Sequence, residues 1–540
     1  MAKYAIVAAD NIKGSGLELL KEHFGPGNVV VRGKFEEDEL VEKIRDFDAL
    51  LIRSGTRVGR KAIEAAGPRL KLIGRAGVGT DNIDKTAATE HGVIVMNTPF
   101  GNTVSAAEQA IALLFAVARN TARADALMQR HQWEKKSLVG IEVFDKVLGV
   151  VGLGKIGQHV VKVMQAAGMR VIAYDPFFAP DRAGELKVEL YPDLDKLLER
   201  ADFVTFHTPL TDDTRNLLSA ERIARMKRGA RIVNCARGGI IDEAALAEAV
   251  KSGRIAAAGF DVFSREPMTD GPLFGVEDIT LTPHLGASTE EAEERCGLQL
   301  AEQVVGFFDR GVIRNAVNVT FSPDPALTPY AELASAMGRI ASYLVNAPVV
   351  DVDIRLAGDF FSGKDGGIIR SSAVRGILDT HGVEGVNDIN SLYLAQQRGI
   401  RTNLSYQEGE NGTLRIDHVD LHVRGDDKGI KKETHLAGTV YQDGRKRIIQ
   451  IDDADIEVRL DQHMLFLRYP DKPGIIGRIG TILGKRDINI ENMQVGILHK
   501  LKKASMVIGT QEPVPPEVVE EIRNDPVLAI ERIYAVDHLV

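Results

Sequence analysis

The stretch Val147-Leu-Gly-Val-Val-Gly-Leu-Gly-Lys-Ile-Gly157 decides the fold of this chain. Its first five residues are mostly apolar or β-branched, which predicts a buried parallel strand. Gly152, Gly154 and Gly157 then follow the spacing G-x-G-x-x-G, and the next residues have helical spacing that ends at a glycine. Asp175 follows a second apolar stretch, at roughly the 20-residue distance expected of a dinucleotide-binding fold.

Each part of this pattern has a physical reason to hold a dinucleotide. Gly152 permits a tight turn, Gly154 lets a pyrophosphate approach the backbone, and Gly157 lets the helix pack closely on the strand. The helix N-terminus offers free N–H groups to the phosphates. Asp175 can bond the ribose hydroxyls and would repel a 2′-phosphate, so the sequence predicts NAD rather than NADP. An ordinary glycine-rich turn is the weaker alternative.

Length and composition limit the classes of function. A chain of 540 residues with 44% hydrophobic and 26% charged residues is long enough for several globular domains. The net charge of −9 gives no support to binding of nucleic acid or a membrane surface. The N-terminus lacks a signal-peptide pattern, and no apolar run approaches a membrane span. Cys235 and Cys296 lack metal-site spacing, so we expect reduced thiols in a cytoplasmic protein without a metal.

The apolar pattern predicts an α/β chain of four parts. Residues 1–98 alternate short strands and helices, as in a parallel-sheet lobe, and residues 290–317 begin with a helix that can return the chain to that lobe. Residues 99–289 form the Rossmann lobe. Residues 318–457 mix strands and helices after a Pro-rich connection. Residues 461–540 have the order β-α-β-β-α-β of a ferredoxin-like domain.

Two local patterns carry further expectations. Ser105-Ala-Ala-Glu108 has the spacing of a capping box, which predicts that a long apolar helix begins there. Asp426-Asp-Lys-Gly-Ile-Lys-Lys-Glu433 is expected to be a polar connection.

Three polar side chains follow successive predicted strands of the Rossmann lobe. Arg237 lies in Asn234-Cys-Ala-Arg-Gly-Gly239, and Glu266 lies in Asp261-Val-Phe-Ser-Arg-Glu-Pro267. His284 lies in Thr282-Pro-His-Leu-Gly-Ala-Ser288. Open α/β folds bind ligands outside the carboxyl ends of their strands, so these residues are placed to meet a nicotinamide ring and its substrate.

The chemistry of these three side chains suits oxidation of an alcohol by hydride transfer. A histidine can take the hydroxyl proton near neutral pH, and a carboxylate beside it can orient the ring and stabilise the imidazolium. A guanidinium can hold a substrate carboxylate or carbonyl in a fixed fork. Singly, each is more often an ordinary loop residue. Together, behind a dinucleotide fold, they favour a catalytic site of Arg237, Glu266 and His284.

These motifs resemble the signatures of the D-isomer-specific 2-hydroxyacid dehydrogenases. Arg53-Ser-Gly-Thr56, the stretch Gly74 to Asp84 and Asn97-Thr-Pro-Phe-Gly-Asn102 are most similar to the members that oxidise 3-phosphoglycerate. The resemblance covers about the first 315 residues. The last two parts resemble the intervening and ACT regulatory domains of the long members. The resemblance implies NAD as cofactor and 3-phosphoglycerate as substrate, which is oxidised to 3-phosphohydroxypyruvate at the entry to serine synthesis.

The resemblance also implies which residues form each site. Beside the three catalytic residues, it places the following near the cofactor: Val78, Gly152, Gly154, Lys155, Ile156, Gly157, Asp175, Thr208, Cys235, Arg237, Asp261, His284, Gly286 and Ala287. It places the following near the substrate: Arg53, Ser54, Arg75, Gly77, Asn102, Arg237 and His284. In the last domain, the loop Tyr469-Pro-Asp-Lys-Pro-Gly474 and Asp487-Ile-Asn-Ile490 resemble a site for the effector L-serine, with Tyr469, Asp471 and Asn489 as its contacts.

Members of the family are homo-oligomers, so the resemblance implies a dimer or tetramer in which Trp133, Lys135 and Lys136 approach a neighbouring subunit's site. A solvated basic turn is an equal alternative for these three. Two other functions stay open from the sequence. A glyoxylate or hydroxypyruvate reductase has a substrate without phosphate, which Arg53 and Arg75 count against. An NAD-sensing, corepressor-like binding protein is disfavoured by a ligand-binding ACT domain after the dehydrogenase fold.

Overall fold

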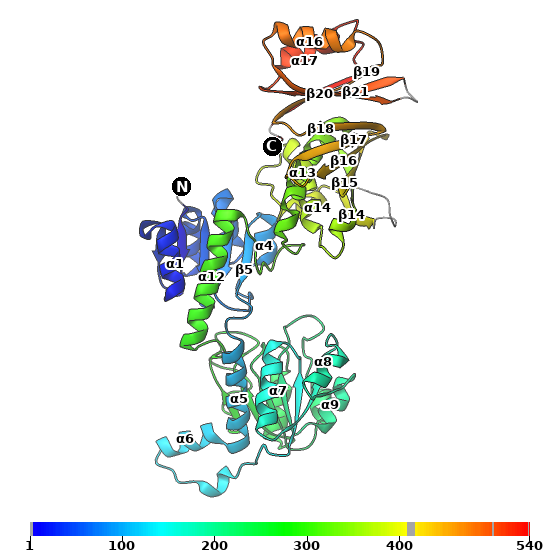
Figure 1. Cartoon of the computed structure of the whole chain (residues 1–540). Helices are drawn as coiled ribbons and strands as arrows, with labels where there is room; N and C mark the ends of the chain where they lie inside the picture. Colours follow the sequence, from blue (N-terminus) through cyan, green and yellow to red (C-terminus); the bar gives the residue numbers. More distant parts are fainter. Residues whose placement is uncertain (1–3, 408–415, 499–501, 538, 540) are drawn as a thin grey trace.

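The computed structural model describes residues 4–407, 416–498, 502–537 and 539. They form four sheets with their helices, which follow one another along an elongated molecule (Figure 1). The predicted α/β class is confirmed: two parallel sheets are followed by a mixed sheet and by a ferredoxin-like one. No helix in the described ranges is both long enough and apolar enough to cross a membrane.

The first sheet is parallel and has the strand order β2-β1-β3-β4-β5. Its inner strands are buried on both faces, as parallel strands covered by helices must be, whereas Val30 and Val31 of the edge strand β2 are exposed. Helix α12 joins this sheet from a distant part of the sequence and packs against α1, where a Cβ on Gly16 would lie 2.3 Å from the carbonyl of Gly297. The elements are β1 (Ile6–Ala8), α1 (Ser15–Phe24), β2 (Val29–Val31), α2 (Glu37–Lys43), β3 (Ala49–Ile52), α3 (Arg60–Ala66), β4 (Leu72–Arg75), α4 (Lys85–Glu90), β5 (Ile94–Asn97) and α12 (Glu290–Arg310).

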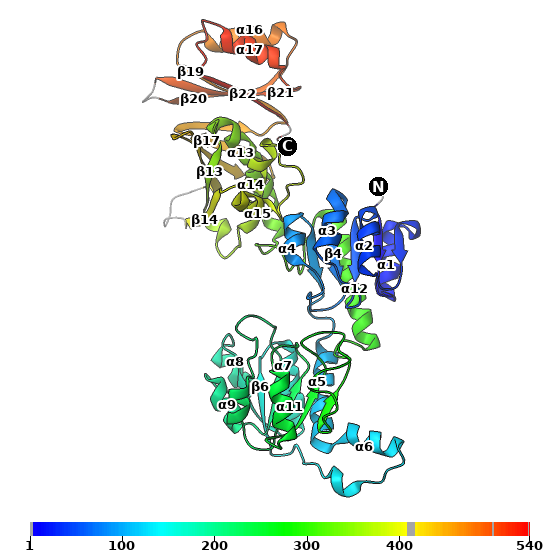
Figure 2. The same cartoon turned by 180° about the vertical axis from the view of Figure 1, so that it is seen from behind.

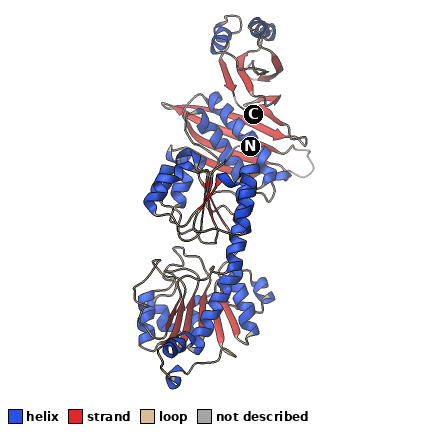
Figure 3. Cartoon of the chain, turned by 90° about the vertical axis from the view of Figure 1, so that its left-hand side faces the viewer, coloured by secondary structure: helices blue, strands red, loops and turns tan. Residues whose placement is uncertain are grey.

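The second sheet is parallel, with the order β12-β11-β10-β9-β6-β7-β8. Its strand order reverses between β6 and β9, which is where open α/β sheets bind ligands. Figure 3 shows helices on both faces of this sheet. The elements are β6 (Val147–Val151), α7 (Lys155–Ala166), β7 (Arg170–Tyr174), α8 (Pro180–Glu185), β8 (Glu189–Leu190), α9 (Leu194–Arg200), β9 (Phe203–Phe206), α10 (Ala220–Arg225), β10 (Ala230–Asn234), α11 (Glu243–Lys251), β11 (Ile255–Phe260) and β12 (Ile279–Leu281).

Helix α5 (Thr103–Arg119) connects the two parallel sheets and leads into α6 (Thr121–Gln129), which projects from the second sheet (Figure 1). The predicted capping box is wrong. Helix α5 begins at Thr103, and its N-cap Asn102 makes no side-chain capping bond. Ser105 is already inside the helix, where its hydroxyl lies 2.9 Å from that of Thr289, the N-cap residue of α12.

The third sheet is mixed, with the order β14-β13-β15-β16-β17-β18. The polar connection predicted for residues 426–433 is wrong, because these residues form a hairpin between β15 and β16. Lys428 and Gly429 both have positive φ, +53° and +90°, as a two-residue hairpin turn requires. The elements are α13 (Thr328–Val345), β13 (Val349–Ala357), α14 (Gly367–Thr380), α15 (Ser391–Gln397), β14 (Arg401–Gln407), β15 (His418–Asp427), β16 (Ile430–Val440), β17 (Lys446–Ile451) and β18 (Ala454–Arg459). Figure 2 shows α15 beside α4 of the first sheet.

The fourth sheet is antiparallel, with the ferredoxin-like order β20-β21-β19-β22. Leu465 and Leu467 on β19 pack toward the helices of this sheet, whereas Met464 and Phe466 join the core of the third sheet. Strand β19 is therefore buried on both faces. The elements are β19 (His463–Pro470), α16 (Ile475–Lys485), β20 (Ile490–Leu498), β21 (Lys503–Thr510), α17 (Pro516–Asn524) and β22 (Arg532–Asp537).

Candidate active site

The glycine-rich turn lies between β6 and α7, and two of its glycines have no room for a side chain. A Cβ on Gly157 would lie 2.1 Å from the carbonyl oxygen of Gly152, and a Cβ on Gly152 would lie 2.6 Å from that of His207. A Cβ on Gly154 would meet nothing within 4 Å. The turn is therefore packed tightly at Gly152 and Gly157 but open at Gly154. An open backbone at Gly154 is what the approach of a pyrophosphate requires.

Asp175 follows β7 and is hydrogen-bonded to the same turn. Its carboxylate accepts the N–H of Leu153 at 2.8 Å and the N–H of Phe177 at 2.9 Å, one at each oxygen. Each oxygen keeps a lone pair for a ribose hydroxyl. Nearby, the buried hydroxyl oxygen of Thr208 has no hydrogen-bond partner among the described residues. An open glycine, a positioned acid and an unpaired hydroxyl fit the NAD that the sequence predicts.

The cofactor residues predicted around this turn differ in their surroundings. Lys155 begins α7 and places its ammonium 3.3 Å from the centre of the Phe100 ring. Ile156 follows it in the first turn of the helix. Burial, with the charge of Asp261 as a second cause, raises the pKa of the Cys235 thiol well above its ordinary value. Cys235 is therefore a neutral thiol, and the structure gives it no nucleophilic role.

His284 and Glu266 form a close pair beyond β11 and β12. The Nδ1 of His284 lies 2.6 Å from the Oε2 of Glu266, and Oε1 of Glu266 accepts the N–H of Phe263 at 2.9 Å. Burial alone would raise the pKa of Glu266, but these two hydrogen bonds hold it below its ordinary value. The carboxylate is therefore ionised and accepts the proton on Nδ1, which leaves Nε2 as the nitrogen that can take a substrate proton.

The loop that carries His284 is held by Asp261, a fully buried acid. The carboxylate of Asp261 accepts the N–H of Leu285 at 2.7 Å and that of Gly286 at 2.8 Å. It also accepts the hydroxyl of Thr282 at 2.6 Å. His284 lies inside this bonded loop in the left-handed region, with φ +58°. Asp261 thus fixes the backbone on both sides of the histidine.

Arg237 extends from the turn after β10 to the first sheet. Its Nε donates to Asp81 at 3.1 Å, and a Cβ on Gly79 would lie 2.2 Å from its Nη2. Gly238 packs the same turn onto the Glu266 loop, because a Cβ there would lie 1.8 Å from the carbonyl of Phe263. The positive charge of Arg237 is one cause of the lowered pKa of Glu266. The structure therefore brings Arg237, Glu266 and His284 together.

Two further arginines lie at the carboxyl ends of strands of the first sheet. Burial, followed by the charge of Arg237, lowers the pKa of Arg75 to about 10, so this guanidinium stays charged at neutral pH. Its Nε is buried without a hydrogen-bond partner in the described ranges, as is the Oδ1 of Asn102.

Arg53 is ion-paired with Glu293 at 2.8 Å. Ser54 is exposed beside it. Gly77 and Val78 lie in the loop after β4, where the Val78 carbonyl accepts the side chain of Asn97 at 2.6 Å.

Sequence reasoning did not identify several residues that support this site. Glu243 is a buried acid that accepts the N–H and hydroxyl of Ser264, beside Glu266. Gln109 donates to Thr282 at 3.0 Å and so supports Asp261. Asp81, the partner of Arg237, is an acid within the motif Gly74 to Asp84. A glutamate at the start of α11 and a glutamine in an apolar helix carry no local signal for these roles.

The predicted effector residues are not assembled within one subunit. Asp471 follows the end of β19 that pairs with Lys503, whereas Asn489 precedes the end of β20 that pairs with Thr510. Lys503 and Thr510 mark opposite ends of β21. Seven residues of extended strand separate them, a distance of roughly 25 Å. The side chain of Tyr469 is 2% exposed and packs in the core of the fourth sheet. A ligand that contacts both Asp471 and Asn489 therefore requires a second subunit.

Three stretches of the chain match known protein families. Residues 111–286 match the NAD-binding domain of the D-isomer-specific 2-hydroxyacid dehydrogenases. Residues 326–452 match the D-3-phosphoglycerate dehydrogenase intervening domain, and residues 463–527 match the ACT domain. An NAD-dependent formate dehydrogenase from Staphylococcus aureus, solved with NAD, covers 58% of this chain and 98% of its own, with TM-score 0.52 and 27% identity. Fold and site together define a D-isomer-specific 2-hydroxyacid dehydrogenase with NAD as its cofactor.

Two relatives extend the similarity over nearly the whole chain. D-3-phosphoglycerate dehydrogenase from Synechocystis is 39% identical over 525 residues, which cover 97% of this chain and 92% of the relative. The enzyme of the same name from Methanocaldococcus jannaschii is also 39% identical over 525 residues, which cover 96% and 98%. The chain belongs to the D-3-phosphoglycerate dehydrogenase family.

Proposed function

We propose that this protein oxidises D-3-phosphoglycerate to 3-phosphohydroxypyruvate with NAD, the first step of L-serine synthesis. The observation that carries the proposal is the His284–Glu266 pair beside Arg237, at the carboxyl ends of the dinucleotide-binding sheet. When bound, NAD accepts the hydride from C2 of the substrate. The Nε2 of His284 takes the hydroxyl proton, Glu266 stabilises the resulting imidazolium, and Arg237 holds the substrate carboxylate and the developing carbonyl.

We assign the substrate side to residues 1–98 and 290–317, and the cofactor side to residues 99–289. Arg75 and Arg53 supply positive charge at the carboxyl ends of β4 and β3, and Asn102 offers an unpaired amide oxygen between the two parallel sheets. A phosphorylated hydroxy acid needs more cationic partners than a simple one, which favours phosphoglycerate over glyoxylate or hydroxypyruvate. The intervening domain (318–457) and the ACT domain (461–540) are assigned to regulation.

Substitution of Arg75 tests the substrate assignment. Arg75→Met should raise the KM for 3-phosphoglycerate by roughly 10- to 100-fold, because it removes a buried charge that contacts the phosphate, and should raise the KM for D-glycerate much less. Equal effects on both substrates would count against a phosphate contact. Faster turnover of glyoxylate than of phosphohydroxypyruvate by the unmodified protein would favour a reductase of the simpler acid.

We also propose that the protein is a homo-oligomer. Helix α6 has no buried residue, and the segment that follows it exposes Trp133 (79% exposed) and Val139 (81% exposed). Exposed apolar side chains on a projecting arm are typical of a surface that a neighbouring subunit covers. Such a contact would bring Trp133, Lys135 and Lys136 near that subunit's site. Sedimentation at micromolar concentration tests this assignment, and a single monomeric species would reject it.

L-Serine is the proposed effector of the ACT domain. Gly474, with φ +90°, opens α16 and leaves the first N–H groups of that helix for a carboxylate, and Asp471 precedes it in the same loop. The separation of Asp471 from Asn489 in one subunit favours a site shared by two ACT domains. A titration with serine, in which binding and turnover are followed separately, tests both the effector site and its effect on activity. Absence of binding at millimolar serine would reject the site, and binding without inhibition would reject the regulation.

A further inference from the structure

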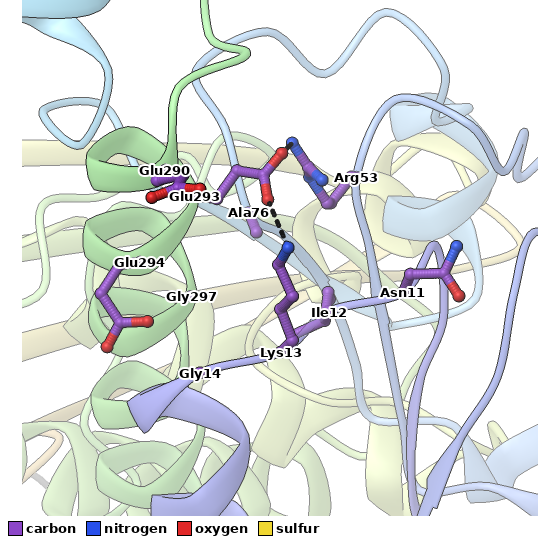
Figure 4. Close-up of a pocket in the computed structure, with 10 residues that line it drawn as sticks. All are labelled: Asn11, Ile12, Lys13, Gly14, Arg53, Ala76, Glu290, Glu293, Glu294 and Gly297. Carbon is purple, nitrogen blue, oxygen red and sulfur yellow. Dashed lines mark ion pairs between the residues drawn. The ribbon is translucent and has the colours of Figure 1, made fainter.

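A cavity of about 290 Å³ lies beside the arginines proposed to bind the substrate (Figure 4). The loop after β1, the carboxyl ends of β3 and β4, and the first turns of α12 form its walls. The lining side chains that bear on its chemistry are Lys13, Arg53, Glu290, Glu293 and Glu294. The cavity thus adjoins the substrate side and is lined by charges of both signs.

One carboxylate in this cavity bridges two cations. The Oε1 of Glu293 lies 2.8 Å from Nη2 of Arg53, and its Oε2 lies 3.6 Å from Nζ of Lys13. Figure 4 shows both cations reaching the Glu293 carboxylate. Glu294, one residue further along α12, accepts the N–H of Ser15 at 3.0 Å. Among the described residues, Glu293 is the only acid within ion-pair distance of either cation.

The backbone holds Lys13 and Arg53 at a fixed separation. Asp10, in the loop after β1, accepts the N–H of Arg53 at 2.8 Å and the N–H of Thr56 at 3.0 Å. Gly14 fixes the other side of Lys13, because a Cβ there would lie 1.9 Å from a carboxylate oxygen of Glu294. The backbone segments that carry Lys13 and Arg53 are therefore fixed, and Glu293 lies between the two cations in the ligand-free protein.

We propose that Glu293 is an internal substitute for the substrate's phosphate, and that Lys13 joins Arg53 in selecting the phosphorylated substrate. This inference rests on the proposed function. A phosphate monoester carries nearly two negative charges near neutral pH and three acceptor oxygens. It can bond the Arg53 guanidinium and the Lys13 ammonium at once, and so displace a carboxylate that carries one charge. A substrate without phosphate leaves Glu293 in place.

Two opposite substitutions test this assignment. Glu293→Gln removes the competing charge and should lower both the KM for 3-phosphoglycerate and the inhibition constant of inorganic phosphate, each by roughly three- to tenfold. Lys13→Met should raise both values by a similar factor. Neither should change the KM for D-glycerate. Lys34→Met is the matched control, because Lys34 forms an exposed ion pair with Glu36 at 3.1 Å on the same part of the chain, and it should change nothing.

The outcomes separate this inference from the proposed function. If the unmodified protein turns over 3-phosphoglycerate but Glu293→Gln and Lys13→Met leave its KM and phosphate inhibition unchanged, the inference is wrong and the proposed function stands. If both variants change the KM for D-glycerate equally, their role is structural and the inference is also wrong. If the unmodified protein has no turnover, the proposed function falls. Calorimetric titration with inorganic phosphate then still tests the cavity, because Glu293→Gln should bind phosphate more tightly than the unmodified protein.

Discussion

The Nδ1 of His284 lies 2.6 Å from the Oε2 of Glu266, although the two residues belong to loops that follow different strands. The carboxylate is ionised, and the imidazole between it and the substrate side is held by Asp261 through the backbone of its loop. A base that is fixed in orientation and stabilised when protonated is what an alcohol oxidation by hydride transfer needs from the protein.

Replacement of His284 tests its role as the base. His284→Asn should lower turnover by roughly 10²- to 10⁴-fold, the range typical of lost general acid–base catalysis, with little change in NAD affinity. His23→Asn is the control, because His23 is an exposed histidine of α1 that lies 2.9 Å from Asp309. Near-normal turnover in the His284 variant would show that another group takes the proton.

Replacement of Glu266 has a defined pH dependence. Although burial opposes it, hydrogen bonding from His284 and Phe263 holds the pKa of Glu266 below its ordinary 4.5 in the folded protein. A carboxyl whose pKa is lower in the folded than in the unfolded protein stabilises the folded state at pH values above its unfolded-state pKa. That stabilisation is lost as the pH falls through its folded-state pKa. The thermal midpoint of Glu266→Gln should therefore lie below that of the unmodified protein from neutral pH down to about 5. The difference between the two thermal midpoints should shrink in more acidic solution. Equal midpoints at pH 7 would mean that the carboxyl of Glu266 is already protonated there.

Two glycines of the nucleotide turn should respond differently to alanine. Gly157→Ala forces a Cβ to within 2.1 Å of the Gly152 carbonyl and should lower the thermal midpoint as well as NAD affinity. Gly154→Ala meets nothing within 4 Å in the ligand-free protein, so it should leave the midpoint unchanged and weaken NAD binding alone. Unaltered NAD affinity in Gly154→Ala would place the pyrophosphate elsewhere.

Asp175 should account for the preference between the two nicotinamide cofactors. The unmodified protein should use NAD far better than NADP, because the carboxylate after β7 repels a 2′-phosphate. Asp175→Ala should lower the ratio of kcat/KM with NAD to kcat/KM with NADP by about tenfold or more. A tenfold change corresponds to roughly 1.4 kcal/mol. Steady-state rates with both cofactors measure this ratio, and an unchanged ratio would show that another group excludes NADP.

The parts that the sequence predicted well are those with local physical causes. The glycine turn, the acid after β7 and the helix from Glu290 each have their signal within a few residues, and the structure places all three as expected. The βαββαβ order of the fourth sheet could also be predicted, because each strand and helix has its own apolar period.

The parts that sequence reasoning missed depend on contacts between distant segments. The β15–β16 hairpin resembles a polar connection in the sequence, because its outward residues are charged and hide the alternation of a strand. The local spacing around Ser105 predicts a helix cap, but the partner of its hydroxyl, Thr289, lies far along the chain. The pairing of Glu293 with Arg53 has no local signature either, since neither residue is unusual in its own segment.

The proposed function is tested most directly by the initial rate of NADH formation by the purified protein with 3-phosphoglycerate and NAD, with phosphohydroxypyruvate trapped as it forms. We expect steady turnover that requires both reactants, falls by orders of magnitude in His284→Asn, and exceeds the rate with D-glycerate. No NADH formation from 3-phosphoglycerate by the folded, NAD-binding protein, or an equal rate with D-glycerate, would contradict it.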